Sequence, residues 1–310
     1  MRKEPDGQMA ERETVMIDQL SILIPTFNNP CLELVEELQR QASLVEGFRY
    51  EIIVADDGST DAEVISRNQA INQLAGCRLV ERKCNVGRAA IRNFLAKQAQ
   101  YSWLLFIDSG MGIADADFLR RYLACQRGPV YGGYRLAGDP VALSGNLRFR
   151  YEQSATRHAS TASQRAKQPN ADFHTSNFLV ERSLFLSNPL DERFRKYGYE
   201  DVFWGKQLAE RGTTILHIDN PVLFNTFESN EQYLRKTEEG LTTLHQFRDE
   251  LKGYSRLLKA ADKLRRCHLA PVFTCLFNTF KKRWKRNLIG SAPSLTVFKL
   301  YKLGFLLRLE

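Results

Sequence analysis

Three stretches of the chain are apolar for several residues and then end on polar, mostly acidic residues. They read LSILIPTFNN (20–29), YEIIVADDGSTD (50–61) and SWLLFIDSG (102–110). Short apolar runs bounded by turn residues predict buried strands of a parallel sheet. In such sheets ligands bind at the carboxyl ends of the strands. We therefore expect these strand ends to form one polar rim suited to a nucleotide.

Helical patterns separate the predicted strands. Residues 31–47 carry apolar positions on one face, and Asp61 is placed to cap a helix over 61–74. A short strand over 77–83 precedes an Ala-rich helix that is entered through Asn85, Val86 and Gly87. After the third apolar run, a helix capped by Asp115 or Asp117 and a strand over 129–135 are expected. This alternation through residue 134 predicts an α/β open sheet with right-handed crossovers.

The middle of the chain loses this regularity. Residues 135–175 are polar with no clear period, which predicts a loop that covers the substrate. Regular patterns return with a segment over 176–185, a helix over 200–212 and a strand over 214–224. Leucines at helical spacing then predict helix over 231–262.

Composition limits the class of protein. The 310 residues are 43% hydrophobic and 26% charged, which is typical of a soluble globular protein. No stretch approaches the ~18 apolar residues of a membrane-spanning helix, and the charged opening does not resemble a secretory signal. Six cysteines without a CxxC pair favour reduced thiols over disulfides or zinc. We expect a cytoplasmic protein with a disordered N-terminus (1–15), a main domain (16–228) and a helical basic extension (229–310).

The positive charge belongs to that extension. Residues 263–310 hold eleven Lys/Arg against one acid, which leaves 33 basic and 35 acidic residues elsewhere. Phe273, Leu276, Phe277, Phe280, Trp284 and Leu288 fall at helical spacing among these lysines and arginines. A basic amphipathic helix with aromatic residues is typical of a surface that binds anionic membranes. The alternative is a helix packed on the main domain, and no motif indicates nucleic-acid binding.

Two loops carry side chains suited to a nucleotide. A carboxylate such as Asp57 can read a uracil-like base, which presents an N–H donor. The helix that follows Gly87 can attract phosphate through its free N–H groups, with positive charge added by Arg88 and Arg92. The structural alternatives are a turn plus helix cap at 57–60 and a capped surface helix at 85–88.

Five motifs then stand in a recognisable order: IPTFNN, VADDGSTD, NVGRAAIRN, LLFIDSG and GYEDVFW. Over about residues 16–228 the chain resembles bacterial family 2 glycosyltransferases, inverting enzymes that use nucleotide-diphosphate sugars. The resemblance implies the GT-A fold, a three-layer α/β/α sandwich with a mostly parallel sheet, here followed by a helical C-terminal extension.

The resemblance also implies roles for single residues. Asp57 matches the carboxylate that reads the base, and Asp201 matches the general base of a carboxylate pair completed by Glu200. A carboxylate at a helix start stays ionised, which suits a base. The full set expected to bind the nucleotide-sugar is Pro25, Thr26, Asn28, Asp56, Asp57, Asn85, Gly87, Arg88, Arg92, Asp108 and Ser109.

The chain departs from the family at the metal position. The family carries a D-x-D whose last Asp binds a divalent metal, and many relatives place a His downstream. This sequence has Gly110 and Asn225 at those positions, which leaves Asp108 as the expected ligand for Mn²⁺ or Mg²⁺. Alternatively, basic side chains neutralise the diphosphate; the candidates are Arg165, Lys167, Arg193, Arg195 and Lys196.

These features together predict an inverting glycosyltransferase. It would move a sugar from a nucleotide-diphosphate sugar, first of all a UDP-sugar, to a hydroxyl of a glycan or lipid-linked acceptor in cell-surface polysaccharide synthesis. The alternative is a catalytically weakened sugar-nucleotide-binding protein that scaffolds a membrane glycan-assembly complex. A nucleotidyltransferase is disfavoured because no G-x-G-T-R loop follows the first strand.

Overall fold

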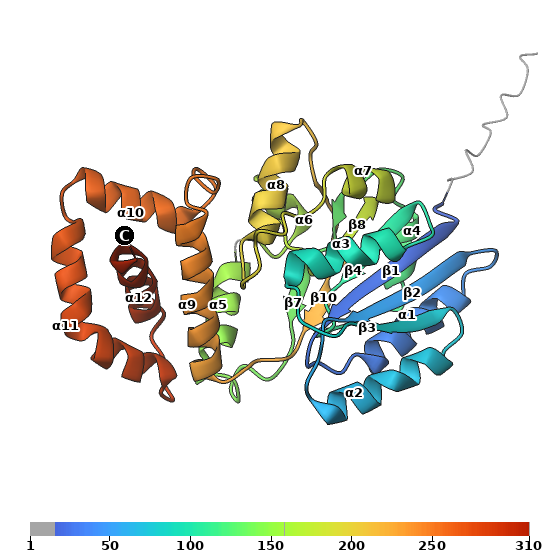
Figure 1. Ribbon diagram of the computed structural model, residues 1–310, viewed down its shortest axis with the longest axis horizontal. Coiled ribbons are helices and arrows are strands. Elements are labelled where there is room, and N and C mark those ends of the chain that lie inside the picture. The colour runs from blue at the N-terminus through green and yellow to red at the C-terminus, as the bar shows by residue number, and fades with distance from the viewer. Residues whose placement is uncertain (1–15, 158, 310) are drawn as a thin grey trace, which may run out of the picture.

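The computed structural model describes residues 16–157 and 159–309. A sheet domain and a block of helices lie side by side along the long axis of the molecule (Figure 1). The expected disordered N-terminus, residues 1–15, lies outside the described residues. The loop between residues 224 and 230 joins the two parts.

The main sheet has seven strands in the order β3-β2-β1-β4-β8-β6-β9. Only β8 runs against the others, so the sheet is mostly parallel, as the sequence predicts. The strands are β1 (Gln19–Thr26), β2 (Arg49–Asp56), β3 (Cys77–Glu81), β4 (Trp103–Ile107), β6 (Val130–Tyr131), β8 (Asn177–Glu181) and β9 (Leu216–His217).

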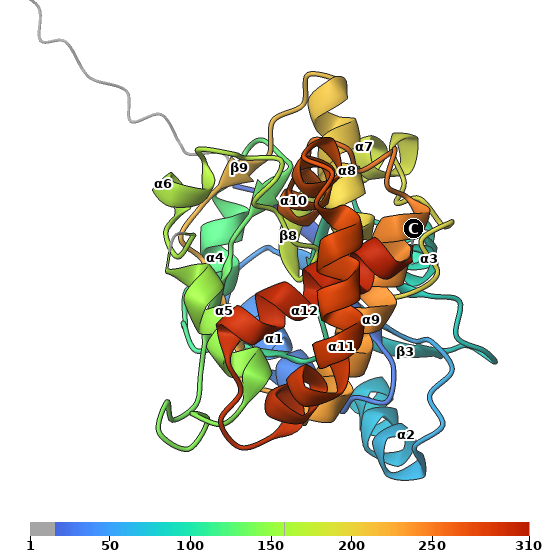
Figure 2. The same cartoon turned by 90° about the vertical axis from the view of Figure 1, so that its left-hand side faces the viewer.

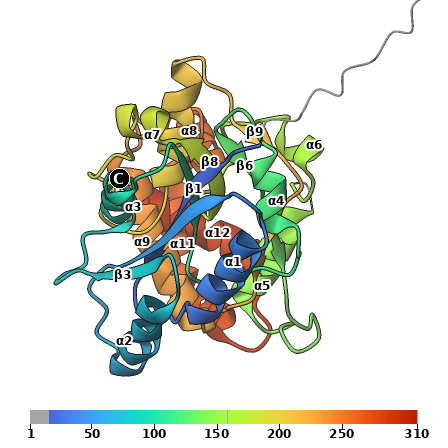
Figure 3. The ribbon, with the colours of Figure 1, turned by 90° about the vertical axis from the view of Figure 1, so that its right-hand side faces the viewer.

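Helices cover both faces of this sheet. Alternate residues of β1 point to opposite faces, so Ile22 and Ile24 pack against α1 and α4 whereas Leu23 packs against α3. Figures 1 and 3 show α1 and α3 on opposite sides of the strands. The result is the three-layer α/β/α arrangement that the motifs predict. Its helices are α1 (Leu32–Ser43), α2 (Ala62–Gln69), η1 (Ala70–Gln73), α3 (Arg88–Gln98), α4 (Phe118–Leu123), α7 (Arg182–Ser187) and α8 (Glu200–Glu210).

A second sheet of three short strands has the order β5-β10-β7. It consists of β5 (Met111–Gly112), β7 (Tyr134–Leu136) and β10 (Val222–Phe224). The expected single strands over 129–135 and 214–224 are therefore wrong. Each divides into two strands, β6 with β7 and β9 with β10, because the chain leaves the main sheet in mid-segment and pairs with the smaller one.

The expected structureless loop over 135–175 is also wrong, because it contains α5 (Leu147–Thr156) and α6 (Ala162–Arg165). Asn146 caps α5 by accepting a hydrogen bond from the backbone of Phe149, at 2.8 Å. The apolar face of α5 is narrow, with Leu147 and Phe149 as its buried residues, so its sequence shows no clear helical period. Packing against α9 stabilises this helix, which the local sequence pattern does not predict.

The C-terminal block consists of α9 (Asn230–Gln246), α10 (Arg256–Arg266), α11 (Ala270–Ile289) and α12 (Leu295–Arg308). The expected helix over 231–262 is interrupted between residues 247 and 255. Figures 1 and 2 show α12 surrounded by the other three helices. Phe277 and Leu288 of α11 are buried against Phe298 and Tyr301 of α12, so this helix packs within the C-terminal block and not on the main domain as the packed-helix alternative had it. Among the described residues, no helix is both long and apolar enough to cross a bilayer.

Candidate active site

The three strand ends named in the sequence analysis meet at one edge of the main sheet. Strand β1 lies between β2 and β4, and Thr26 is directly opposite Asp56. Asp108 follows β4 immediately and completes the row. Pro25 is buried in register with Ala55. The parallel pairing therefore produces the polar rim that the apolar runs predict.

Asn28 joins the first two loops of this rim. Its side-chain oxygen accepts hydrogen bonds from the backbone of Thr60 at 2.8 Å and of Asp61 at 3.0 Å. Its own backbone N–H donates to the hydroxyl of Ser59 at 2.7 Å. Asn28 adopts a positive φ of 47°, a conformation that Asn tolerates better than most residues. The loop after β1 is thus held against the loop after β2.

Asp57 connects that pair of loops to the segment before α3. Its carboxylate accepts hydrogen bonds from the backbone N–H groups of Val86 and Gly87, each at 3.1 Å. Burial raises the pKa of Asp57, and these N–H donors oppose the rise. Gly87 has a φ of 95°, and a Cβ there would lie 2.8 Å from the carbonyl oxygen of Arg195. The VADDGSTD and NVGRAAIRN motifs therefore form one structural unit.

Other predicted residues of the rim make local hydrogen bonds. Asp56 accepts from the backbone of Ser59 at 2.8 Å, so it also closes a turn. The hydroxyl of Thr26 donates to the carbonyl of Asn29 at 2.8 Å. Ser109 accepts from the Asn29 amide at 3.2 Å, and Asn85 accepts from the backbone of Gly87 at 3.1 Å.

Beside this unit lies an ion cluster of Arg88, Arg92, Asp108 and Glu200. Arg88 donates through Nε to Glu200 at 2.6 Å and through Nη2 to Asp108 at 3.2 Å. Arg92, whose side chain is 2% exposed, pairs with the other oxygen of Asp108. Although burial alone would raise the pKa of Asp108, the two guanidinium groups hold it below the usual range. The cluster joins α3, β4 and α8, three elements that are distant in the sequence.

Asp201, the predicted base, follows Glu200 in the first turn of α8. Its carboxylate lies 3.1 Å from Nδ1 of His174 and accepts a hydrogen bond from the backbone of Val202 at 2.8 Å. Burial would raise the pKa of Asp201, but the hydrogen bond and charge of His174 lower it instead. The same contact outweighs burial at His174 and raises the pKa of the imidazole.

The sequence analysis missed His174, which it left within the loop over 135–175. The reason is topological: β8 runs antiparallel to β4, so it begins at the edge where the parallel strands end. Asn177 is opposite Ile107, and the backbone of Asp108 donates to the carbonyl of Ser176 at 3.0 Å. The sequence shows a histidine just before an apolar segment, but the pattern of that segment does not show its direction, so the residue could not be assigned to the site from the sequence.

The residues present do not fit a resident divalent metal. Both oxygens of Asp108 are engaged by arginines. In the β5–β10 ladder Phe224 is opposite Met111, so the next step places Asn225 opposite Gly110. Neither residue offers a carboxylate or an imidazole, and the amide oxygen of Asn225 accepts from the Thr226 hydroxyl at 3.2 Å. Across the described parts of the chain, no three His, Cys, Asp or Glu residues gather as a metal site.

The proposed substitutes for a metal are scattered. Arg165 is buried and donates to carbonyl groups, including that of Ile218 at 2.8 Å, so its role is structural. Arg193 pairs with Asp191 at 2.7 Å. Lys167 and Lys196 are exposed. The backbone of Arg195 lies against Gly87 at the start of α3.

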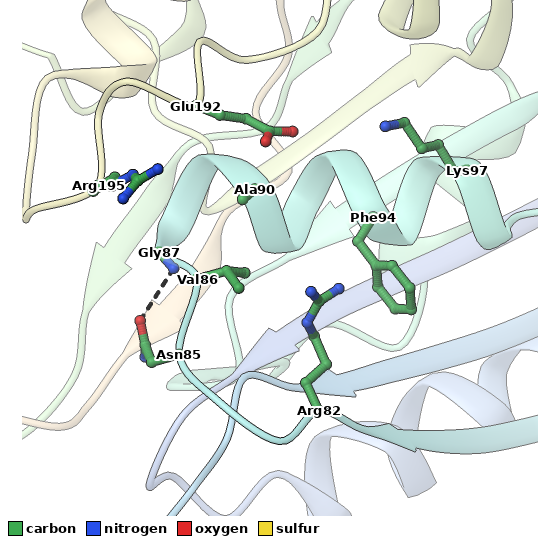
Figure 4. A pocket seen from close by; sticks show the side chains of 9 residues that line it. All are labelled: Arg82, Asn85, Val86, Gly87, Ala90, Phe94, Lys97, Glu192 and Arg195. Carbon is green, nitrogen blue, oxygen red and sulfur yellow. Dashed lines mark hydrogen bonds between the residues drawn. The ribbon is translucent and has the colours of Figure 1, made fainter.

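A hollow of about 500 Å³ opens beside α3, and the residues that line it do not include Asp56, Asp57 or Asp108. Figure 4 shows Arg195 near the start of α3 and Arg82 on the other side of Ala90, with Phe94 of the same helix beside Arg82. Among the predicted nucleotide-sugar residues it contains only Asn85 and Gly87. The residues that line this hollow include neither the members of the ion cluster nor Asp201.

Comparison with known proteins found relatives that are named as glycosyltransferases. Two curated relatives match about a third of the chain. A poly(ribitol-phosphate) beta-glucosyltransferase from Bacillus spizizenii is 36% identical over 107 residues, which is 34% of this chain and 17% of the relative. A validoxylamine A glucosyltransferase from Streptomyces hygroscopicus is 30% identical over 119 residues, 38% of this chain and 28% of the relative. The chain thus spans less than a third of the length of these relatives.

Solved structures share the fold at low sequence identity. Residues 1–349 of S. aureus TarS superpose with a TM-score of 0.51 and 14% identity, covering 94% of this chain and 91% of that one. The mannosyltransferase PcManGT from Pyrobaculum calidifontis, in complex with GDP-Man and Mn²⁺, gives 0.50 and 16%, with 94% and 80% covered. The profile described as Glycosyl transferase family 2 matches residues 21–186. Because that segment is more than half of the chain and includes all three strand ends, the chain belongs to glycosyl transferase family 2.

Proposed function

We propose that the protein is an inverting glycosyltransferase that moves a sugar from a UDP-sugar to an acceptor hydroxyl. The observation that carries this proposal is the position of Asp201. Its carboxylate sits at the N-terminus of α8, hydrogen-bonded to His174, next to the Glu200 that contacts Arg88. A candidate base and a candidate diphosphate partner thus occupy one edge of the sheet.

The chemistry assigned to Asp201 is general-base catalysis. The carboxylate takes the proton of the acceptor hydroxyl while that oxygen forms a bond to C1 of the sugar. The bond between C1 and the diphosphate oxygen breaks on the opposite side, and the nucleoside diphosphate leaves with the electron pair. The helix N-terminus and His174 both favour the ionised carboxylate, so the base is ready before the acceptor binds. His174 acts through Asp201 as a positioning residue.

The donor is proposed to lie across the strand ends. Asp57 would read the base, with Pro25, Thr26, Asn28, Asp56 and Asn85 shaping the nucleoside pocket. Arg88 is 38% exposed, in contrast to Arg92, and can turn from its carboxylate partners toward a diphosphate. Arginine is suited to this role because its planar group binds phosphate through two parallel hydrogen bonds. We propose that this positive charge, rather than a tightly held metal, balances the leaving group.

The acceptor class is proposed from the relatives and the basic extension. One relative is named for poly(ribitol-phosphate), which supports a glycan acceptor and cell-surface polysaccharide synthesis. The other is named for validoxylamine A, so a small polyol belongs in the same acceptor panel. We propose that residues 263–310 hold the cytoplasmic enzyme at an anionic membrane surface, where lipid-linked acceptors are found.

The deciding experiment replaces Asp201 with Asn, which keeps the size and most hydrogen bonds of the side chain. We expect turnover or hydrolysis of the UDP-sugar to fall by about 10²–10⁴-fold, the usual contribution of a general base, while UDP binding by calorimetry is retained. Replacing Asp172 with Asn, a charge-matched control outside this contact, should leave turnover intact. Equal turnover in D201N and wild type would refute the assignment. UDP-sugar binding without turnover in the wild type would instead favour the scaffolding alternative.

A further inference from the structure

The aromatic face of α11 is not available to a membrane. Phe277 is fully buried, and its ring lies 5.4 Å from that of Tyr301 on α12. Leu288 is also buried, and Trp284 packs against the same cluster. Phe277, Trp284 and Leu288, which the sequence pattern places on the membrane-binding side, therefore hold the C-terminal block together, whereas Leu276 of the same predicted set is exposed.

The opposite face of α11 is exposed and has an unusual composition. Leu269, at the start of the helix, is 50% exposed, Val272 is 66% and Leu276 is 43%. Residues 272, 276, 283 and 286 follow one line along a helix, so this apolar patch continues directly into Arg283 and Arg286. Lys282 is exposed beside them. The outward face thus changes from apolar to basic over about 20 Å, the length of the segment from residue 272 to residue 286.

The basic half of this face is not neutralised by the protein. Helix α11 contains five Lys/Arg and no Asp or Glu. Within residues 16–157 and 159–309, no carboxylate lies within 4.0 Å of any Lys or Arg from 281 to 308. Elsewhere exposed arginines commonly have such partners, as Arg40 has Glu37 and Arg193 has Asp191. The charges of α11 are therefore available to an external polyanion.

Figure 1 shows α11 at the end of the molecule farthest from the main sheet, and Figure 2 shows it from outside. We propose that the outward face of α11 binds the surface of an anionic bilayer and lies parallel to it. Leu269, Val272 and Leu276 enter the headgroup boundary, while Lys282, Arg283 and Arg286 contact the anionic headgroups. Apolar and basic residues side by side match a lipid surface better than nucleic acid, which offers no apolar layer. The inference rests on the membrane setting proposed above and assigns it to one face.

The test uses the full chain and vesicles of phosphatidylglycerol mixed with phosphatidylcholine. We expect wild type to float with these vesicles and not with phosphatidylcholine alone. Each basic residue near an anionic surface is worth about 1 kcal/mol, or about fivefold in partitioning. The triple variant Lys282→Glu, Arg283→Glu, Arg286→Glu should therefore bind at least about 100-fold more weakly. The double variant Val272→Ser, Leu276→Ser should weaken the binding that persists in high salt.

The matched control is Arg127→Glu, Arg211→Glu, Lys252→Glu, which changes net charge equally at exposed positions outside α11. An equal loss of vesicle binding in the control would refute the assignment to α11, because net charge alone would explain it. The assignment would also be refuted if the wild type does not bind vesicles but forms a dimer in solution, and the V272S/L276S variant is a monomer. That result would show that the face binds a second copy of the chain. Hydrolysis of UDP-sugar in detergent-free solution should be unchanged in all variants, so failure of this inference is distinguishable from failure of the catalytic proposal.

Discussion

The two sides of the candidate site are held in different ways. On one side, Asn28 and Asp57 bind backbone N–H groups of neighbouring loops, and Asp56 binds a backbone N–H group of its own turn. On the other side, the side chains of the ion cluster bind one another. A side chain fixed to backbone amides moves only if the loop moves. An ion pair between side chains exchanges by rotation, so a charged ligand can enter it.

This difference suggests that the two sides of the candidate site have different roles. The backbone-anchored side is preformed and suits a nucleoside, whose shape and hydrogen-bond pattern do not change during the reaction. The ion cluster contains two arginines and two carboxylates, and its partly exposed member, Arg88, is the one that contacts both carboxylates. Such a cluster can respond to the charge that appears on the leaving diphosphate. The next three predictions test this comparison.

The largest effect is expected from removing one charge on each side. Asp108→Asn leaves the buried Arg92 without its carboxylate and should lower the free energy of unfolding by about 3 kcal/mol. Asp57→Asn keeps an acceptor for Val86 and Gly87 and should cost about 1 kcal/mol. Urea denaturation of the two variants measures the difference. Equal losses would remove the distinction between the two sides.

A smaller effect is expected at His174. His174→Gln removes the charge that lowers the pKa of Asp201, so burial dominates and that pKa rises. The acid limb of kcat/KM should then move to higher pH.

The pKa of His174 itself is raised above about 6.5, so its contribution to stability is complete below that pH and is lost as the pH rises through the raised value.

Two measurements check this prediction: kcat/KM as a function of pH, and the free energy of unfolding on either side of neutrality. His217→Gln serves as the control, since His217 bonds the carbonyl of Pro169 instead of a predicted catalytic residue. An unchanged acid limb in His174→Gln, or the same shift in His217→Gln, would show that His174 does not control the base.

The smallest effect is expected from metal removal. A Lewis-acid metal contributes several kcal/mol to many transfer reactions, so a chelator usually abolishes their activity. Here we expect most of the turnover to survive EDTA, because Arg88 and Arg92 occupy both oxygens of Asp108. The double variant Gly110→Asp, Asn225→His should become responsive to Mn²⁺, as the two positions face each other. A strict Mn²⁺ requirement in wild type would contradict the proposal.

Much of this architecture was accessible from the sequence because the information is local. The apolar runs at 20–25 and 102–107 predict buried strands, which β1 and β4 confirm, and Asp61 caps α2 as its position predicts, accepting hydrogen bonds from the backbone of Glu63 and Val64. The five motifs stand along the sequence in the order of the family that the chain resembles, which implies roles for single residues. Asp57, Arg88 and Asp201 were therefore named before their neighbours were known.

What the sequence did not reveal depends on contacts between distant segments. The antiparallel direction of β8 brings His174 to the site, and a single strand pattern does not encode direction. Arg88 and Arg92 were expected at phosphate, but their ion pairs with Asp108 required the packing of α3 beside β4 and α8. Likewise, the aromatic side of α11 could not be assigned to the interior until α12 was seen beside it.

The enclosure of α12 has a consequence for how the protein is made. Leu306 and Leu307 of α12 pack in one cluster with Phe194 and Phe203, which flank the turn that presents Glu200 and Asp201. On the ribosome, the sheet can form long before these residues emerge. The proposed base therefore reaches its final setting only after Leu306 and Leu307 have left the ribosome, whereas the strand ends proposed to bind the nucleotide can form earlier.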